Sequence, residues 1–211
     1  LKRCRGEYVY FLNPDTVVQP GAFRQMMDFM ASHTDVGLAG TRIVNPDGSA
    51  QSSVEKRYPG QKQTKTELAG LPGDIAWVLG ASMIARRPIV ETLGGFDDRF
   101  FLYGEEQDLC LRIRRAGWKI GFIPEALVVH WGAQSERDTS VRDLWQKKFR
   151  AEALFYGKHY SSGSIQRIHR TNVLQALWRV FSLRLTLPLC SDRKAALAKL
   201  ADPEPFMVVV A

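Results

Sequence analysis

Three carboxylates lie within four positions of one short acidic segment. Glu105, Glu106 and Asp108 follow directly on the aromatic run at residues 100–104. Like charges this close repel one another, and a carboxylate beside apolar side chains holds its proton more tightly than one in water. The pattern predicts that one of these acids takes part in proton or cation chemistry.

A second acidic site follows a short apolar segment upstream. Residues 7–12 predict a buried strand, and Asn13-Pro14-Asp15-Thr16 comes directly after it. Open α/β sheets bind ligands at the carboxyl ends of their strands. By itself, Asn-Pro-Asp is typical of a turn. Together with the later acidic helix start, a metal-capable carboxylate at a strand end predicts group transfer from a phosphate-bearing donor.

Five motifs, in order over roughly the first 135 residues, resemble the inverting glycosyltransferases of family 2. Within that family they are most similar to the rhamnosyltransferase-like enzymes that build bacterial cell-surface polysaccharides. The motifs are Arg5-Gly6-Glu7-Tyr8-Val9-Tyr10-Phe11-Leu12-Asn13-Pro14-Asp15-Thr16, Gly94-Gly95-Phe96-Asp97, Tyr103-Gly104-Glu105-Glu106-Gln107-Asp108-Leu109-Cys110-Leu111-Arg112, Ala116-Gly117-Trp118 and Val129-His130-Trp131-Gly132.

The resemblance implies an α/β fold of the GT-A type, the nucleotide-diphospho-sugar transferase fold. Family members normally begin with a strand-helix-strand unit that holds the nucleotide base and ribose, whereas this chain reaches the metal-motif strand at Tyr8. We therefore expect residues 1–135 to be the C-terminal portion of an N-terminally truncated GT-A domain. Residues 136–211 are expected to form a helical extension and tail.

The resemblance also implies roles for the acidic segment. The family's base is the second residue of the acidic pair, which is Glu106 here, where Asp is more usual. The alternative is that Glu106 only complements the helix dipole. Glu105 is expected either to contact the acceptor or to be a solvated helix start. Asp108 either pairs with Arg112 four residues later or orients the acceptor or Glu106.

Asp15 and His130 match the metal positions of the family, and Mg²⁺ or Mn²⁺ is the expected cofactor. Asn13 replaces the first Asp of the usual pair, so we expect it to contact the donor or fix the loop. A lone strand histidine is otherwise more often a packed core residue.

A segment of small residues follows Trp77. Gly80 and Ala81 are expected to let the donor or acceptor approach the backbone closely, with tight packing as the alternative. We assign Gly80 and Ala81 to the donor. Trp77 and Asp97 are assigned to the acceptor, while the alternative for Asp97 is a turn cap.

Composition indicates a globular chain with anionic partners. The 211 residues are 45% hydrophobic, and the net charge is +7. This charge favours a nucleotide-diphosphate sugar, a glycan or polyprenyl-pyrophosphate-linked acceptor and an anionic membrane surface. No nucleic-acid module is recognisable, so we expect no nucleic-acid partner. Three widely spaced cysteines and no run of ~20 apolar residues favour a cytoplasmic protein, peripheral on the inner face of the membrane.

Periodicity and turn residues predict the elements that position these groups. The expected elements are a helix at 20–33, a strand at 36–44, a turn at 45–48, a mobile loop near the site mouth at 52–73, a strand at 77–86, helices at 88–94 and 105–116, two strands at 120–123 and 127–131 divided by Pro124, a flexible polar segment at 133–140, a helix at 141–160, a break at 161–164 and a basic amphipathic helix at 165–187.

The function expected is inverting, metal-assisted transfer of rhamnose or a related sugar to a lipid-linked or cell-surface glycan. An inactive remnant or an acceptor-binding module without a donor site is the alternative. The third interpretation is a nucleotidyltransferase of the same fold, which would need a Gly-rich loop bearing Lys or Arg upstream of Leu1. The apolar stripe of the last helix is expected either to enter a membrane surface or to pack on the catalytic domain. It consists of Leu174, Leu177, Trp178 and Phe181.

Overall fold

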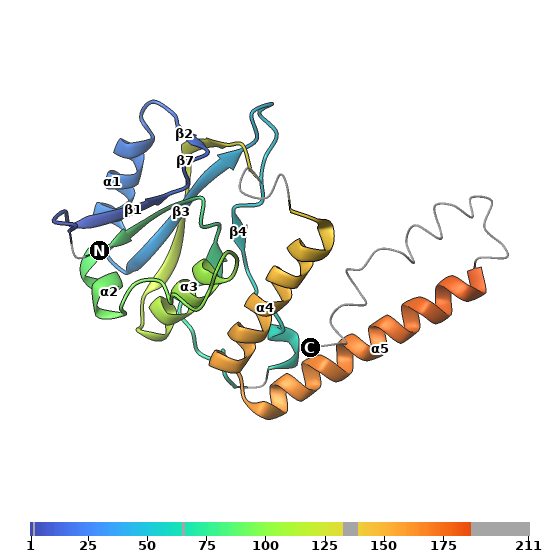
Figure 1. Ribbon diagram of the computed structural model, residues 1–211. Helices are drawn as coiled ribbons and strands as arrows, with labels where there is room; N and C mark the ends of the chain where they lie inside the picture. The colour runs from blue at the N-terminus through green and yellow to red at the C-terminus, as the bar shows by residue number, and fades with distance from the viewer. Residues whose placement is uncertain (2, 65, 133–138, 187–211) are drawn as a thin grey trace. The chain divides into compact units, whose positions relative to one another are not determined.

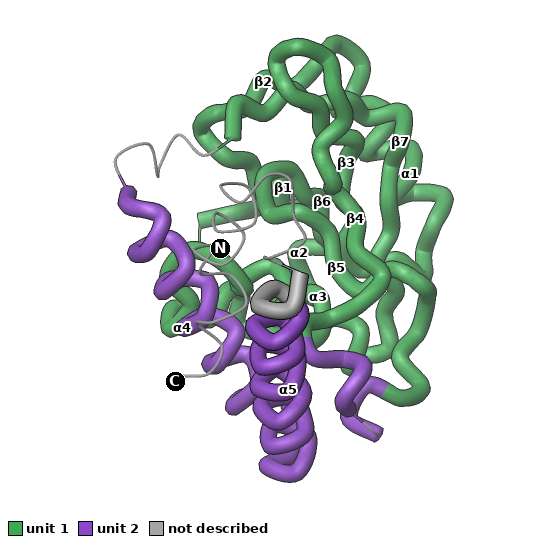
Figure 2. Tube along the Cα trace, turned by 90° about the vertical axis from the view of Figure 1, so that its right-hand side faces the viewer, with its two compact units in different colours: residues 1–59, 69–137 green, residues 60–68, 138–211 purple. Residues whose placement is uncertain are grey.

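The computed structural model describes residues 1, 3–64, 66–132 and 139–186 (Figure 1), with side chains up to residue 182. The chain forms two compact units, coloured separately in Figure 2. Among the described residues, one unit comprises 1–59 and 69–132, and the other comprises 60–68 and 139–186. All residues proposed above for chemistry lie in the first unit.

The first unit is built on a five-stranded mixed sheet (Figure 1). Its only parallel pair is β3 with β7, and the other neighbours are antiparallel. In spatial order the strands are β1 (Tyr8–Leu12), β6 (Ser82–Arg86), β3 (Val36–Val44), β7 (Lys119–His130) and β2 (Thr16–Val18). A small second sheet pairs β4 (Val54–Glu55) with β5 (Trp77–Val78).

Two helices cover opposite faces of this sheet. Neighbouring strand residues point to opposite faces, and Leu38 packs in the cluster of helix α3 (Glu105–Arg115) while Ala39 packs in that of helix α1 (Ala22–Ser32). The short helix α2 (Arg87–Thr92) follows β6 directly. The strand at 36–44 and the helices predicted at 20–33, 88–94, 105–116 and 141–160 are confirmed. Residues 165–186 are helical as predicted, but the apolar residues of this helix are not concentrated on one face. Met26 and Met30 of α1 are fully buried, whereas Met27 is 47% exposed.

Two strand predictions are wrong. The strand expected at 77–86 is divided, because β5 pairs with β4 whereas β6 pairs with β1 and β3. The two strands expected around Pro124 are one continuous strand, β7. Its register against β3 shifts between Ile123 and Leu127, so Pro124 lies in a bulge. A bulge does not require the ladder N–H that proline lacks.

The second unit contains the one-turn helix η1 (Gln61–Gln63), helix α4 (Val141–His159) and helix α5 (Ser162–Thr186). The carboxylate of Glu67 accepts hydrogen bonds from the hydroxyls of Ser161 and Ser164, at 2.7 and 2.5 Å. The predicted break at 161–164 is shorter than expected, because α4 ends at His159 and α5 begins at Ser162. Most of the polar segment expected at 133–140 lies outside the described residues.

Candidate active site

A cavity of about 580 Å³ opens at the end of β1. Its lining includes residues 11–15, from the end of β1 and the turn after it, and residues 79–81 between β5 and β6. The rest comes from residues 96–98 and 100–103, the start of α3 and the end of β7. Eight of the ten predicted site residues line it: Asn13, Asp15, Gly80, Ala81, Asp97, Glu105, Glu106 and His130. Trp77 and Asp108 do not. None of residues 52–59 or 69–73 lines the cavity, and these are the parts of the expected mouth loop that lie in the first unit.

Asp15 and His130 meet at one edge of this cavity. Asp15 lies between β1 and β2, and its backbone carbonyl accepts the amide of Trp131 at 3.0 Å. His130 ends β7, opposite Thr16 of β2. The Oδ1 atom of Asp15 is 3.4 Å from Nε2 of His130. The backbone N–H of Asn13 donates to the backbone carbonyl of Ala81 at 3.0 Å and so connects two of the segments that line the cavity.

The sequence analysis missed a residue that holds His130. Oε1 of Gln51 lies 2.9 Å from Nδ1 of His130. The Nε2 group of Gln51 donates to the backbone carbonyl of His130 at 2.8 Å and to Oδ1 of Asn45 at 2.6 Å. Gln51 and His130 are 79 residues apart, and no local pattern marks Gln51 as a partner of a histidine.

The acid pair lines the cavity from the first turn of α3, which forms its α3 edge. Glu106 is only 7% exposed, and the Oε2 atoms of Glu105 and Glu106 are both buried without a hydrogen-bond partner among the described residues. Burial first, and then the charge of Glu105, raises the pKa of Glu106 to about 7. Burial also raises the pKa of Glu105. A carboxyl with a pKa near neutrality is suited to accept a proton at the pH of a cell.

The backbone before α3 turns through three consecutive left-handed residues. Leu102, Tyr103 and Gly104 have φ values of 61°, 75° and 86°. This conformation is strained for Leu and Tyr, and such strain is found most often at functional sites. Across from it, a methyl group added to Gly80 would lie 3.6 Å from Cβ of Glu106. That is an ordinary contact, so packing against Glu106 does not demand glycine there.

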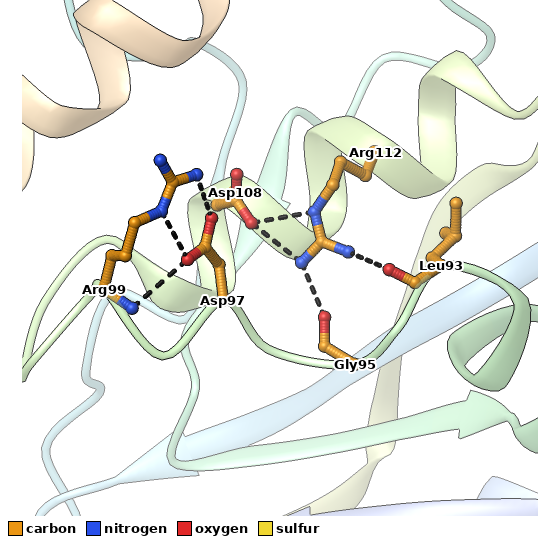
Figure 3. A network of polar contacts seen from close by, with 6 residues as sticks. All are labelled: Leu93, Gly95, Asp97, Arg99, Asp108 and Arg112. Carbon is orange, nitrogen blue, oxygen red and sulfur yellow. Dashed lines mark hydrogen bonds and ion pairs between the residues drawn. The ribbon is translucent and has the colours of Figure 1, made fainter.

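Two acids near Glu105 and Glu106, namely Asp97 and Asp108, form ion pairs with arginines (Figure 3). Asp108 is fully buried and pairs with Arg112 at 2.7 Å, which confirms the predicted pair four residues apart. Arg112 also donates to the carbonyls of Leu93 and Gly95, at 2.9 and 2.7 Å. Asp97 lines the cavity and pairs with Arg99 at 2.6 Å. Asp108 thus fastens the segment before Asp97 to α3 through Arg112 and does not reach the cavity.

Trp77 is also directed away from the cavity. Its indole N–H donates to the carbonyl of Arg57 at 3.0 Å, and its ring packs against the core cluster beneath α3. Phenylalanines form the apolar wall instead. Phe11 and Phe96 pack edge to face with ring centroids 4.9 Å apart, and Phe101 is 84% exposed. The aromatic run at 100–104 was evident in the sequence, but the contact between Phe96 and Phe11 was not.

The Asp15 and His130 edge suits a divalent cation. A carboxylate oxygen and an imidazole nitrogen 3.4 Å apart are a donor set that Mn²⁺ accepts. The described residues include no cluster of three or more His, Cys, Asp or Glu that could hold a metal alone. A cation held here would therefore complete its coordination with water and the phosphates of a donor, which is usual for Mg²⁺.

Helices cover both faces of the sheet, and carboxylates surround a cavity at its strand ends. This arrangement is typical of α/β proteins that bind a ligand at the carboxyl ends of their strands. Residues 1–151 match the model of the glycosyltransferase-like family 2, and the chain belongs to this family. The predicted family and its GT-A fold are thereby confirmed.

Curated relatives agree with this assignment. The chain is 29% identical over 150 residues to the N-acetylglucosaminyl-diphospho-decaprenol L-rhamnosyltransferase of Mycobacterium tuberculosis, covering 61% of this chain and 48% of the relative. It is 23% identical over 144 residues to rhamnosyltransferase WbbL of Escherichia coli, covering 62% and 54%. The chain thus spans about half the length of these relatives.

Similarity to solved structures is more distant. Residues 1–349 of S. aureus TarS match with a TM-score of 0.48 and 13% identity, over 99% of this chain and 58% of that one. The mannosyltransferase PcManGT from Pyrobaculum calidifontis, in complex with GDP-Man and Mn²⁺, matches with a TM-score of 0.43 and 14% identity, over 99% and 62%. The family assignment rests on the family model alone.

Proposed function

We propose that this chain carries the base and the metal ligands of an inverting enzyme that transfers a sugar from a nucleotide-diphosphate donor. The observation that supports this most is that Glu106 lines the same cavity as Asp15 and His130. Its buried Oε2 atom has no hydrogen-bond partner among the described residues, and its pKa is raised to about 7. Group transfer with inversion needs a proton acceptor on one side of the reacting carbon and charge stabilisation on the other.

In the proposed reaction, Glu106 takes the proton from an acceptor hydroxyl. The hydroxyl oxygen forms a bond to the anomeric carbon as the bond from that carbon to the diphosphate oxygen breaks, and attack from the opposite face inverts the centre. A divalent cation held by Asp15 and His130 would neutralise the negative charge on the leaving diphosphate. Asn13, Gly80 and Ala81 line the cavity where we propose the donor lies.

On the acceptor side we propose Asp97, Glu105 and the phenylalanine wall, because sugars present apolar C–H faces as well as hydroxyls. The printed names of the two relatives describe rhamnosyl transfer, one of them to a decaprenol-linked sugar. We therefore propose rhamnose or a related sugar as the donor group and a polyprenyl-pyrophosphate-linked glycan as the acceptor.

The test is a product assay with the complete gene product, a panel of nucleotide-diphosphate sugars and a polyprenyl-pyrophosphate-linked acceptor. Transfer with inverted linkage supports the proposal. Acceptor binding without transfer by any donor would instead support an acceptor-binding module or inactive remnant. Asp15→Ala should weaken donor binding in Mn²⁺ but not in chelator, and equal Mn²⁺ affinity of variant and wild type would remove the metal role of Asp15.

We also propose that α5 meets an anionic membrane surface, which would place the protein on the cytoplasmic face near its acceptor. Within the described residues, no helix is long and apolar enough to cross a bilayer. Leu174, Leu177, Trp178 and Phe181 are each more than half exposed on α5, and Arg170 is exposed on the same helix. Apolar and cationic side chains together suit an anionic interface.

Co-sedimentation with vesicles containing anionic lipid tests this surface. We expect binding at low salt that weakens when Trp178→Glu and Phe181→Glu are combined. Phe23→Glu, at an exposed phenylalanine of α1, is the matched control and should leave binding unchanged. Absence of binding, or equal loss in the control, would mean that these apolar side chains of α5 have another partner or pack within the protein.

A further inference from the structure

A chain of hydrogen bonds runs from the turn after β3 to His130. The hydroxyl of Ser49 donates to Asp47 at 2.6 Å, and the side-chain amide of Asn45 donates to that hydroxyl at 2.8 Å. The amide of Gln51 donates to Oδ1 of Asn45 at 2.6 Å. Oε1 of Gln51 then lies 2.9 Å from Nδ1 of His130. The turn at 45–48, evident in the sequence, thus connects to a proposed metal ligand.

Two groups that can only accept hydrogen bonds set the direction of this chain. The first is the Asp47 carboxylate, since the hydroxyl and amide of Ser49 hold the pKa of Asp47 below its ordinary value. The second is the backbone carbonyl of His130, which accepts from Nε2 of Gln51 at 2.8 Å. Turning the Gln51 amide over would set its oxygen against this carbonyl and against Oδ1 of Asn45. Oε1 of Gln51 must therefore face the histidine.

An acceptor facing Nδ1 requires that Nδ1 carries the proton. In a neutral imidazole the other nitrogen, Nε2, then has only a lone pair. That lone pair lies at the cavity edge, 3.4 Å from the Asp15 carboxylate oxygen. Two acceptors at this distance repel each other, and a positive charge near both, such as a bound divalent cation, relieves that repulsion.

We propose that Gln51, oriented by Asn45 and the Asp47 turn, is a positioning residue that holds His130 as the Nδ1–H tautomer and so offers Nε2 to a cation. The metal half of this inference rests on the function proposed above. The tautomer half does not, because it follows from the hydrogen bonds of the protein alone. Hydrogen-bond partners of metal-bound histidines commonly fix the tautomer in this way.

The tautomer can be read directly by long-range ¹H–¹⁵N NMR on the full chain without metal, at a pH about two units above the ordinary histidine pKa of ~6.5. His130→Gln identifies the resonances. We expect the Nδ1–H form in the wild type. In Gln51→Leu the acceptor is lost, so the proton should move to Nε2, where it can bond to Asp15. An Nε2–H tautomer in the wild type would overturn the proposal.

Mn²⁺ affinity, followed by electron paramagnetic resonance with a nucleoside diphosphate present, measures the consequence. Gln51→Leu should weaken Mn²⁺ binding by about 10- to 100-fold, the usual effect of removing such a partner. Gln51→Glu keeps an acceptor for Nδ1–H but sets its second oxygen against the His130 carbonyl, so it should recover only part of the affinity. Gln25→Leu, at an exposed glutamine of α1, is the control and should match the wild type.

Asp47→Ala provides a variant on the exposed turn in case Gln51→Leu fails to fold. This change removes the acceptor at which the series of hydrogen bonds begins. We therefore expect both tautomers of His130 and a smaller loss of Mn²⁺ affinity than in Gln51→Leu. Unchanged tautomer and affinity would remove Asp47 from the proposal. An Nδ1–H tautomer in a protein that binds no Mn²⁺ would support the role of Gln51 and overturn the metal role in the proposed function.

Discussion

The two edges of the cavity treat their charged groups in opposite ways. At the Asp15 edge, His130 is held through Gln51 by a continuous series of hydrogen bonds. At the α3 edge, Glu105 and Glu106 each keep a buried carboxylate oxygen that has no hydrogen-bond partner among the described residues. Both edges belong to the same compact unit.

The contrast follows from what each group would have to do. A ligand atom must keep its direction, and hydrogen bonds to the rest of its ring supply that. A base must keep its affinity for a proton, and every hydrogen bond donated to a carboxylate lowers that affinity. Burial, and then the charge of Glu105, raises the pKa of Glu106 to about 7, and no donor to its Oε2 atom among the described residues offsets that rise.

The largest effect should come from Glu106→Gln in the complete protein. An amide cannot take the proton, so turnover should fall by about 10²- to 10⁴-fold with donor affinity nearly unchanged. Rate and donor-binding measurements check this. Glu125→Gln, at an exposed glutamate of β7, should have no effect. Turnover retained in Glu106→Gln would move the base to Glu105.

The third acid of α3 extends the comparison, since Asp108 is buried like Glu106 but paired. Asp108→Asn should lower the free energy of unfolding by about 3 kcal/mol, because it leaves the Arg112 charge without its counter-ion. The matched change Glu91→Gln breaks an exposed pair with Arg87 at the same spacing and should cost less than about 1 kcal/mol. Denaturant melts of both variants give the comparison, and equal losses would contradict it.

The pH dependence should separate the effect of burial from that of the neighbouring charge. Glu106 must lose its proton to act, so kcat/KM should rise with pH through about 7. Glu105→Gln removes the smaller cause of the shift, so the rise should move to lower pH yet stay above the ordinary Glu value, because burial remains. A rise that does not move would mean that burial alone sets the pKa of Glu106.

The same raised pKa predicts a change in stability. A carboxyl whose pKa is higher in the folded state stabilises the fold at low pH and loses that contribution as pH rises from ~4.3 to about 7. The loss should be at most roughly 4 kcal/mol and should be absent in Glu106→Gln. Thermal melts across this range measure it. A wild type and variant with parallel pH profiles would show that Glu106 is not the group responsible.

Local sequence determined the parts that depend on near neighbours. The strand at 36–44, the helices of both units and the pair of Asp108 with Arg112 follow from periodicity and from spacing along one helix face. The order of the motifs also sufficed to predict the family and to select eight residues that share the cavity. Each of these properties is set within a few turns of chain or by the order of the motifs along it.

Only the tertiary structure decided which groups have partners. Gln51 meets His130 because β3 and β7 are neighbours in the sheet, so that the segment after β3 reaches the end of β7. The bulge at Pro124 and the division of residues 77–86 depend on which strand each segment pairs with. Glu106 and Asp108 are two positions apart, yet Asp108 pairs with Arg112 whereas Oε2 of Glu106 has no hydrogen-bond partner among the described residues. Pairing and burial are decided by residues distant in the chain, and hence so is the proton affinity of Glu106.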